Sequence, residues 1–102
     1  MTIDGISQST GADRVVTVEA AGAAVSVVVS ERAENVEIGR AIIPIDGLMA
    51  VLIERPVGPQ SVAQDVGVEV RRNEVWLIVG GADAAVGLDD LMDAVAAANP
   101  SV

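Results

Sequence analysis

The sequence predicts an α+β fold, in which an antiparallel sheet of about five strands carries two helices on one face. Three features lead to this prediction: valine-rich stretches that alternate apolar and polar residues, two apolar segments with helical spacing, and a similarity between the two halves of the chain. The chain has 102 residues, so we expect a single domain, 1–102, with a small core.

Period-two alternation marks the strands. Between Arg14 and Ala20, one side of the chain carries Val16, Val18 and Ala20, and the other carries Thr17 and Glu19. The same criterion predicts strands at 14–20, 25–29, 36–43, 66–70 and 75–79, the first two joined as a hairpin. The polar segment 1–12 is expected to form a loose N-terminal arm or a short strand entry, and 56–64, which is rich in proline and glycine, a linker.

A helix is expected after each hairpin. The clearer one spans 88–98, because its apolar residues form a stripe, aspartates lie near its N-terminus and Pro100 follows it. The shorter segment 46–55 has helical spacing, with Asp46 as the expected N-cap. Since this segment is apolar on nearly all sides, a buried strand is the alternative.

The two halves of the chain are similar at an offset of 50 residues. Identical pairs are Val16/Val66, Val18/Val68, Glu19/Glu69, Val25/Val75 and Val29/Val79. Each hairpin is then followed by Asp-x-Leu-Met, at Asp46 and at Asp89. The pattern favours an internal duplication, ββ(β)α–ββα, with halves 13–56 and 65–100 and with the two aspartates as equivalent caps. Chance matching of abundant valines is the other interpretation.

Charge and composition limit the classes of partner. The net charge of −9 disfavours nucleic acid and anionic membranes, whereas a basic protein partner is compatible with it. There is no cysteine, no apolar run of membrane-spanning length and no basic, apolar leader at the N-terminus. We therefore expect a cytoplasmic protein, or one held inside a virion or another assembly.

The residue types that enzymes most often use are missing. The chain has no histidine, cysteine, lysine or tyrosine, so we predict no catalytic residue and no cofactor. Asp83, Asp89, Asp90 and Asp93 are the strongest candidates for a cation site, but they lack the spacing of a calcium loop. The aspartates of the expected helix are explained equally well, without a cation, by their favourable interaction with the helix dipole. We therefore predict no metal site.

Trp76 is the only aromatic residue, within the strand 75–79, which is apolar on both faces. If Val75, Leu77 and Val79 face the helices, Trp76 and Ile78 lie on the opposite face, which then needs another chain to cover it. Met49 and Ile53, in the mainly apolar segment 46–55, are further interface candidates.

These observations predict a non-catalytic protein-interaction or assembly module that forms a homodimer or larger oligomer and binds a second protein, possibly a basic one. Its outline is similar to that of secretion chaperones, a likeness of fold alone, and an accessory role in a phage or virion fits the same features. The alternative is an acidic inhibitor that mimics nucleic acid and occupies a basic cleft. That alternative requires carboxylates spaced like phosphates along one face.

Overall fold

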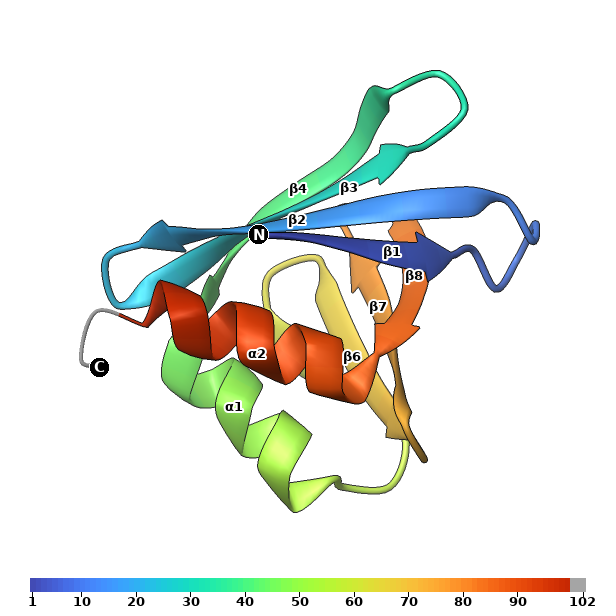
Figure 1. Ribbon diagram of the computed structural model, residues 1–102. Helices are drawn as coiled ribbons and strands as arrows, with labels where there is room; N and C mark the ends of the chain where they lie inside the picture. The colour runs from blue at the N-terminus through green and yellow to red at the C-terminus, as the bar shows by residue number, and fades with distance from the viewer. Residues whose placement is uncertain (100–102) are drawn as a thin grey trace.

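The computed structural model describes residues 1–99, so Pro100, expected after the second helix, lies outside the described residues. The elements, in chain order, are β1 (Thr2–Ile6), β2 (Asp13–Ala21), β3 (Ala24–Glu31), β4 (Val36–Pro44), α1 (Ile45–Glu54), β5 (Gln60–Ala63), β6 (Val66–Arg71), β7 (Glu74–Val79), β8 (Ala82–Gly87) and α2 (Leu88–Ala98) (Figure 1). The segment 46–55 is therefore helical, as predicted.

The eight strands form one antiparallel sheet in the order β4-β3-β2-β1-β8-β7-β6-β5. Its two edge strands, β4 and β5, approach each other without pairing, so the sheet is a nearly closed barrel. The prediction of a five-stranded sheet with two helices on one face is therefore wrong. All five expected strands are present, but β5 and β8 were not predicted, and β1 was expected only as a short strand entry, the alternative to a loose arm.

β1, β5 and β8 lack the valine-rich alternation of the other strands. β1 lies in the segment expected to be a loose arm or a short strand entry, and β5 lies in the expected linker and is only four residues long. β8 carries small residues at its inward positions Ala82 and Ala84. These segments are strands because of their place in the sheet rather than because of the β-propensity of their residues. Each one satisfies the backbone hydrogen bonds of a neighbouring strand that would otherwise be an edge strand.

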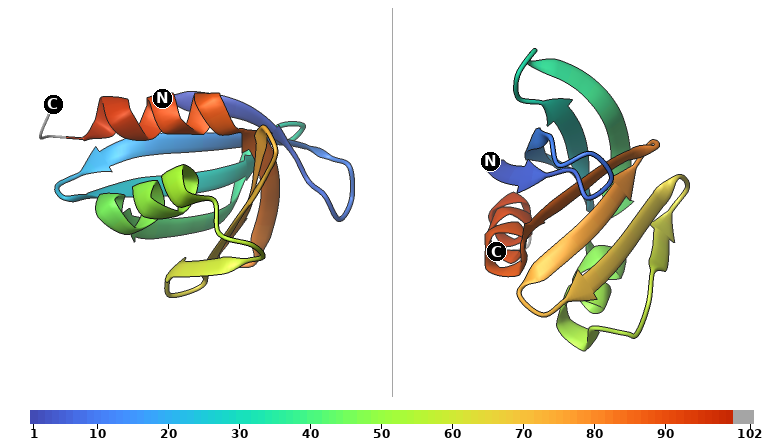
Figure 2. Two further views of the ribbon diagram at one scale, coloured as in Figure 1. Left: turned by 90° about the horizontal axis from the view of Figure 1, so that it is seen from below. Right: turned by 90° about the vertical axis from the view of Figure 1, so that its right-hand side faces the viewer.

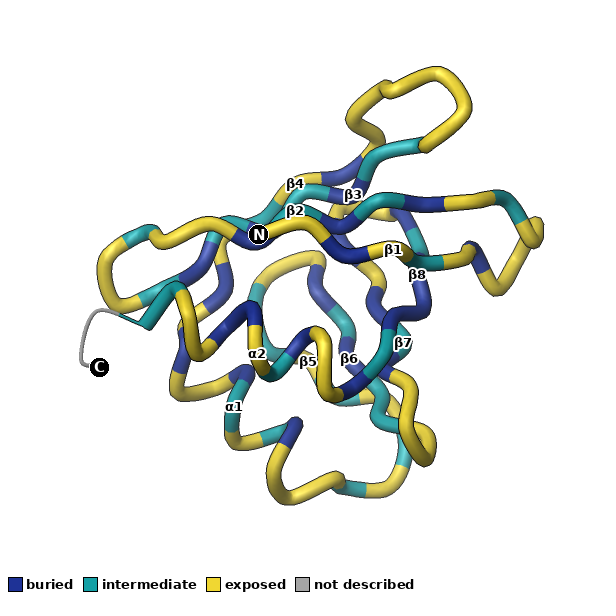
Figure 3. The backbone as a smooth tube through the Cα atoms, in the orientation of Figure 1, coloured by how far each residue is buried: buried dark blue, intermediate teal, exposed yellow. Residues whose placement is uncertain are grey.

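The core lies inside the curved sheet, where both helices pack side by side (Figures 1 and 2). Each helix buries residues at spacings of three and four: Ile45, Leu48 and Leu52 in α1, and Leu88, Leu91 and Val95 in α2. Alternate residues of β2, β3, β6 and β7 point at these helices and are buried, while their neighbours face outward (Figure 3).

The two halves share the same strand register. In the first half the inward pairs are Val16–Val29, Val18–Val27, Val27–Ala41 and Val25–Ile43. In the second half they are Val66–Val79, Val68–Leu77, Leu77–Ala84 and Val75–Val86. Equivalent residues of the two halves are 50 positions apart in the β2–β3 and β6–β7 hairpins. They are 43 positions apart in β4 and β8, because the β7–β8 turn is shorter than the β3–β4 turn. Each half is thus a four-stranded meander followed by one helix, and the predicted ββ(β)α–ββα unit is too small.

The predicted helix caps are also wrong. The N-cap positions are Pro44 in α1 and Gly87 in α2, and neither helix has a side-chain cap hydrogen bond. Asp46 and Asp89 instead lie two residues after these N-cap positions, inside the first turn, where their charge interacts favourably with the positive end of the helix dipole. They occupy equivalent positions, but they do not act as caps.

Closure of the sheet depends on Gly39 in β4. A methyl group at Gly39 would overlap the carbonyl oxygen of Val79 and would lie 2.9 Å from the Cβ of Ala82. Gly39 and Ala82 are equivalent positions of the two meanders, since they pair with Val29 and Val79. The two halves therefore meet at matching small residues.

We predict that Gly39→Ala destabilises the fold by about 3 kcal/mol, because backbone has to move to admit the methyl group. Gly47→Ala is the matched control: it lies inside α1, and a Cβ there meets no atom within 4 Å. It should stabilise the fold by roughly 0.5–1 kcal/mol. Urea unfolding followed by circular dichroism measures both, and equal effects of the two variants would contradict the role of Gly39.

Candidate functional site

The outer face of β6, β7 and β8 carries the residues that the core does not use. Two cross-strand rows face outward there: Gly67, Ile78 and Asp83 form one, and Glu69, Trp76 and Ala85 form the other. Ile78 is 53% exposed, which is high for a large apolar side chain on a sheet. We call this surface, made by these two rows, the Trp76 face.

A half-open, mainly apolar hollow of about 460 Å³ lies on the Trp76 face. Its lining includes Trp76, Ile78 and Pro59, with Gln8 and Ser9 from the loop after β1. Gly67 provides space in it, because a Cβ at this position would meet only Ile78, at 4.0 Å. The volume falls in the range that accommodates a small ligand or a large side chain.

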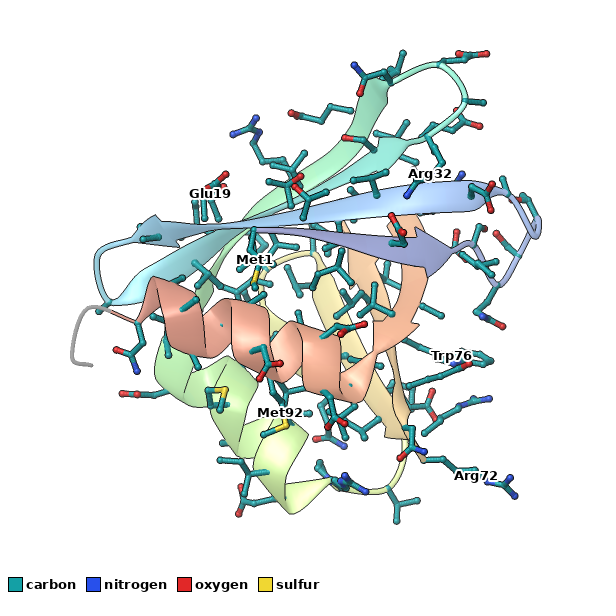
Figure 4. All side chains as sticks on the ribbon, in the orientation of Figure 1. Met1, Glu19, Arg32, Arg72, Trp76 and Met92 are labelled. Atoms are coloured by element: carbon teal, nitrogen blue, oxygen red, sulfur yellow. The ribbon has the colours of Figure 1, made fainter. Side chains whose placement is uncertain are left out.

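Two further hollows adjoin the first. One is lined by Ile78 and Asp65, and the other by Trp76 and Arg72. Ile78 therefore stands between two depressions, as an apolar projection with space on either side. Figure 4 shows Trp76 and Arg72 extending on the same side of the molecule, away from the helices.

Two charged side chains, Arg71 and Glu74, contact the indole of Trp76. The guanidinium carbon of Arg71 lies 3.7 Å from the ring centroid, and Nε1 of Trp76 donates a hydrogen bond of 3.2 Å to Glu74. Arg71 also forms an ion pair with Glu69, at 3.0 Å. One face of the indole is thus covered by a cation, while the ring contributes to the wall of the hollow.

Asp83 fixes the loop that forms another wall. Its carboxylate accepts hydrogen bonds from the hydroxyls of Ser7 and Ser9, at 2.9 and 3.1 Å, and from the backbone N–H groups of Gln8 and Ser9, at 2.8 and 3.0 Å. Partial burial alone would raise the pKa of Asp83. The hydrogen bonds from Ser9, Ser7 and Gln8 outweigh burial, so the pKa lies below its ordinary value.

We predict that acid weakens this anchor. Because the folded-state pKa of Asp83 is lowered, its hydrogen bonds contribute fully above the unfolded pKa of about 3.9 and are lost as the pH falls through the folded value. Asp83→Asn should cost about 1–2 kcal/mol at pH 7 and should lessen the loss of stability between pH 5 and pH 2. Urea unfolding across this range measures both effects.

The control for this variant is Asp93→Asn, since Asp93 is exposed on α2. This variant should leave nearly unchanged both the free energy of unfolding at pH 7 and its decrease as the pH falls. Equal losses in the two variants would show that Asp83 does not anchor the loop.

The structure divides the predicted interface residues between two surfaces. Trp76 and Ile78 lie together on the outer face of β7, as expected from the inward direction of Val75 and Leu77. Met49 and Ile53 lie on α1, on the inner side of the sheet, where Met49 is half-buried and Ile53 is exposed.

The candidate cation ligands are divided as well. Asp83 lies on the outer face of β8, whereas Asp89, Asp90 and Asp93 lie on α2. Within residues 1–99 no three carboxylates are grouped closely enough to hold a metal ion.

Sequence reasoning missed the contribution of the N-terminal loop and of Gly67. The Ser-x-Ser spacing at Ser7 and Ser9 suits two hydroxyls that converge on one carboxylate, but nothing in the sequence points to Asp83 as their partner. Gly67 lies in a strand with alternating residues, where sequence pattern shows only that a glycine weakens the strand, not that it leaves space on the surface.

The equivalent face of the first meander has different residues. Thr17, Ser26, Val28 and Arg40 take the places of Gly67, Trp76, Ile78 and Asp83. The inward pairs that the two halves share are small or aliphatic in both, whereas Arg14, at a buried inward position of β2, lies outside this shared set. The first meander therefore provides an internal control for the Trp76 face.

Comparison with known proteins found no matching family model, no matching curated protein and no matching solved structure. Neither of the helices in residues 1–99 combines the length and apolar character needed to cross a bilayer.

Proposed function

We propose that this chain is a non-catalytic assembly module that associates with a second copy of itself through the Trp76 face. The observation that carries the proposal is the juxtaposition of an exposed apolar projection, Ile78, with hollows on both sides of it. Such a surface leaves apolar area in water when the chain is alone, and covering it supplies the driving force for association.

The charges on the Trp76 face are compatible with a second copy. Glu69 is paired with Arg71, Glu74 accepts from the indole of Trp76, and Asp83 is surrounded by donors from the loop. A second acidic chain can therefore approach without meeting bare carboxylates at the centre of the contact. Desolvating these groups costs less because their partners are already in place.

The net charge of −9 opposes association, but much of it lies away from this face. The helices carry Asp46, Glu54, Asp89, Asp90 and Asp93, on the inner side of the sheet. Repulsion between such distant groups is reduced by salt, with a screening length of about 8 Å at physiological ionic strength. We therefore expect association to strengthen as salt is added.

We predict that Ile78→Glu weakens the dimer at least 100-fold, because a carboxylate would be buried without a partner at the centre of the contact, a cost of about 3 kcal/mol or more. Analytical ultracentrifugation between about 1 and 100 μM measures the dissociation constant. Trp76 emission gives a second measurement, since the chain has no other aromatic residue.

The matched control is Val28→Glu, which places the same charge at the equivalent position of the first meander. It should leave the dissociation constant within a few fold of that of the unaltered chain, provided that circular dichroism shows both variants folded. A chain that stays monomeric at 100 μM and in added salt contradicts the proposal, as does equal weakening by both substitutions.

A further inference from the structure

We propose, resting on the proposed function, that the two copies pack with their β7 strands antiparallel, so that Arg72 of one copy faces Asp65 of the other. The contact would then have a twofold axis lying in the interface and crossing β7 between Trp76 and Ile78. This inference concerns the orientation of the pair and the residues that determine it.

Arg72 and Asp65 mark opposite ends of the Trp76 face. They occupy the turns that flank β6, Arg72 after it and Asp65 before it, and both have left-handed backbone conformations, with φ of 57° and 59°. Arg72 shares a hollow with Trp76, and Asp65 shares a hollow with Ile78. The order along the face is therefore cation, indole, aliphatic side chain and carboxylate.

Neither charge is used inside the chain. Among residues 1–99, Arg14, Arg32, Arg40 and Arg71 form ion pairs with Glu31, Asp4, Glu37 and Glu69. Arg72 and Asp65 form none, and no side-chain hydrogen bond engages either of them. Both side chains are exposed. The face thus has one unpaired cation at one end and one unpaired anion at the other.

Only one of the two simple twofold arrangements pairs these charges. An axis along the strands would place Arg72 over Arg72 and Asp65 over Asp65. An axis across the strands reverses one copy end for end, which places Arg72 over Asp65 twice, because each contact of a twofold interface occurs in duplicate. It also sets Ile78 of each copy against Trp76 and its hollow in the other, so that projections meet depressions.

Charge reversal tests this orientation. Arg72→Asp makes the net charge more negative by two, and Asp65→Arg makes it less negative by two. Overall repulsion alone would therefore weaken the first variant and strengthen the second. The antiparallel pairing predicts that both single variants raise the dissociation constant, by roughly tenfold, because attraction becomes repulsion at two places.

The double variant Arg72→Asp/Asp65→Arg has the charge of the unaltered chain and restores both pairs in reversed sense. Its dissociation constant should return to within about threefold of the original value. Arg55→Asp is the control for charge, since Arg55 also lacks an ion pair within residues 1–99, has a left-handed φ of 50° and lies off the Trp76 face, just after α1. It should change the constant less than threefold.

The outcomes separate the two proposals. If the chain dimerises and Ile78→Glu disrupts the dimer, but the double variant is no tighter than either single one, the face is correct and the orientation is overturned. Opposite effects of the two single variants, as net charge alone predicts, overturn it as well. If the chain does not dimerise at all, the proposed function fails first.

Discussion

The crossing of β4 over the β7–β8 turn is possible because Gly39 has no side chain, and the rest of the architecture follows from this contact. Bringing the fourth strand of one meander onto the last hairpin of the other bends the sheet into its nearly closed form. The bend creates one concave side, which the two helices fill with leucines and valines. It also turns the opposite side of both meanders outward, so that Trp76 and Ile78 become surface residues.

The repeated register explains how so thin a core is organised. In both halves the same inward positions of three consecutive strands pair with one another, and the following helix buries equivalent residues, Leu48 matching Leu91 and Leu52 matching Val95. Each meander has a single apolar side, which it cannot bury alone. Two of them with matching inward surfaces form one shared core.

Residue pattern predicted the strong strands and both helices because those segments bury one side and expose the other. The valines of β2, β3, β6 and β7 alternate for that reason, and the alternation also predicted that Trp76 and Ile78 would share a face. It did not predict β5 and β8, whose residues are strands through their partners rather than through their own pattern. The caps failed because Pro44 and Gly87 allow the chain to pass directly from strand to helix, which leaves Asp46 and Asp89 already inside the first turn.

The junction between β1 and β8 is unlike the other strand pairs, since a single residue pair, Ile6 with Ala85, joins them. Every other ladder links strands that follow one another in the chain, so each meander can form from local contacts. Joining the meanders instead closes a long loop, from Ile6 to Ala85, for one backbone pair, so side-chain packing and the hydrogen bonds from the loop after β1 to Asp83 have to hold the junction. We therefore expect the two meanders to form early during folding, and their docking to limit its rate.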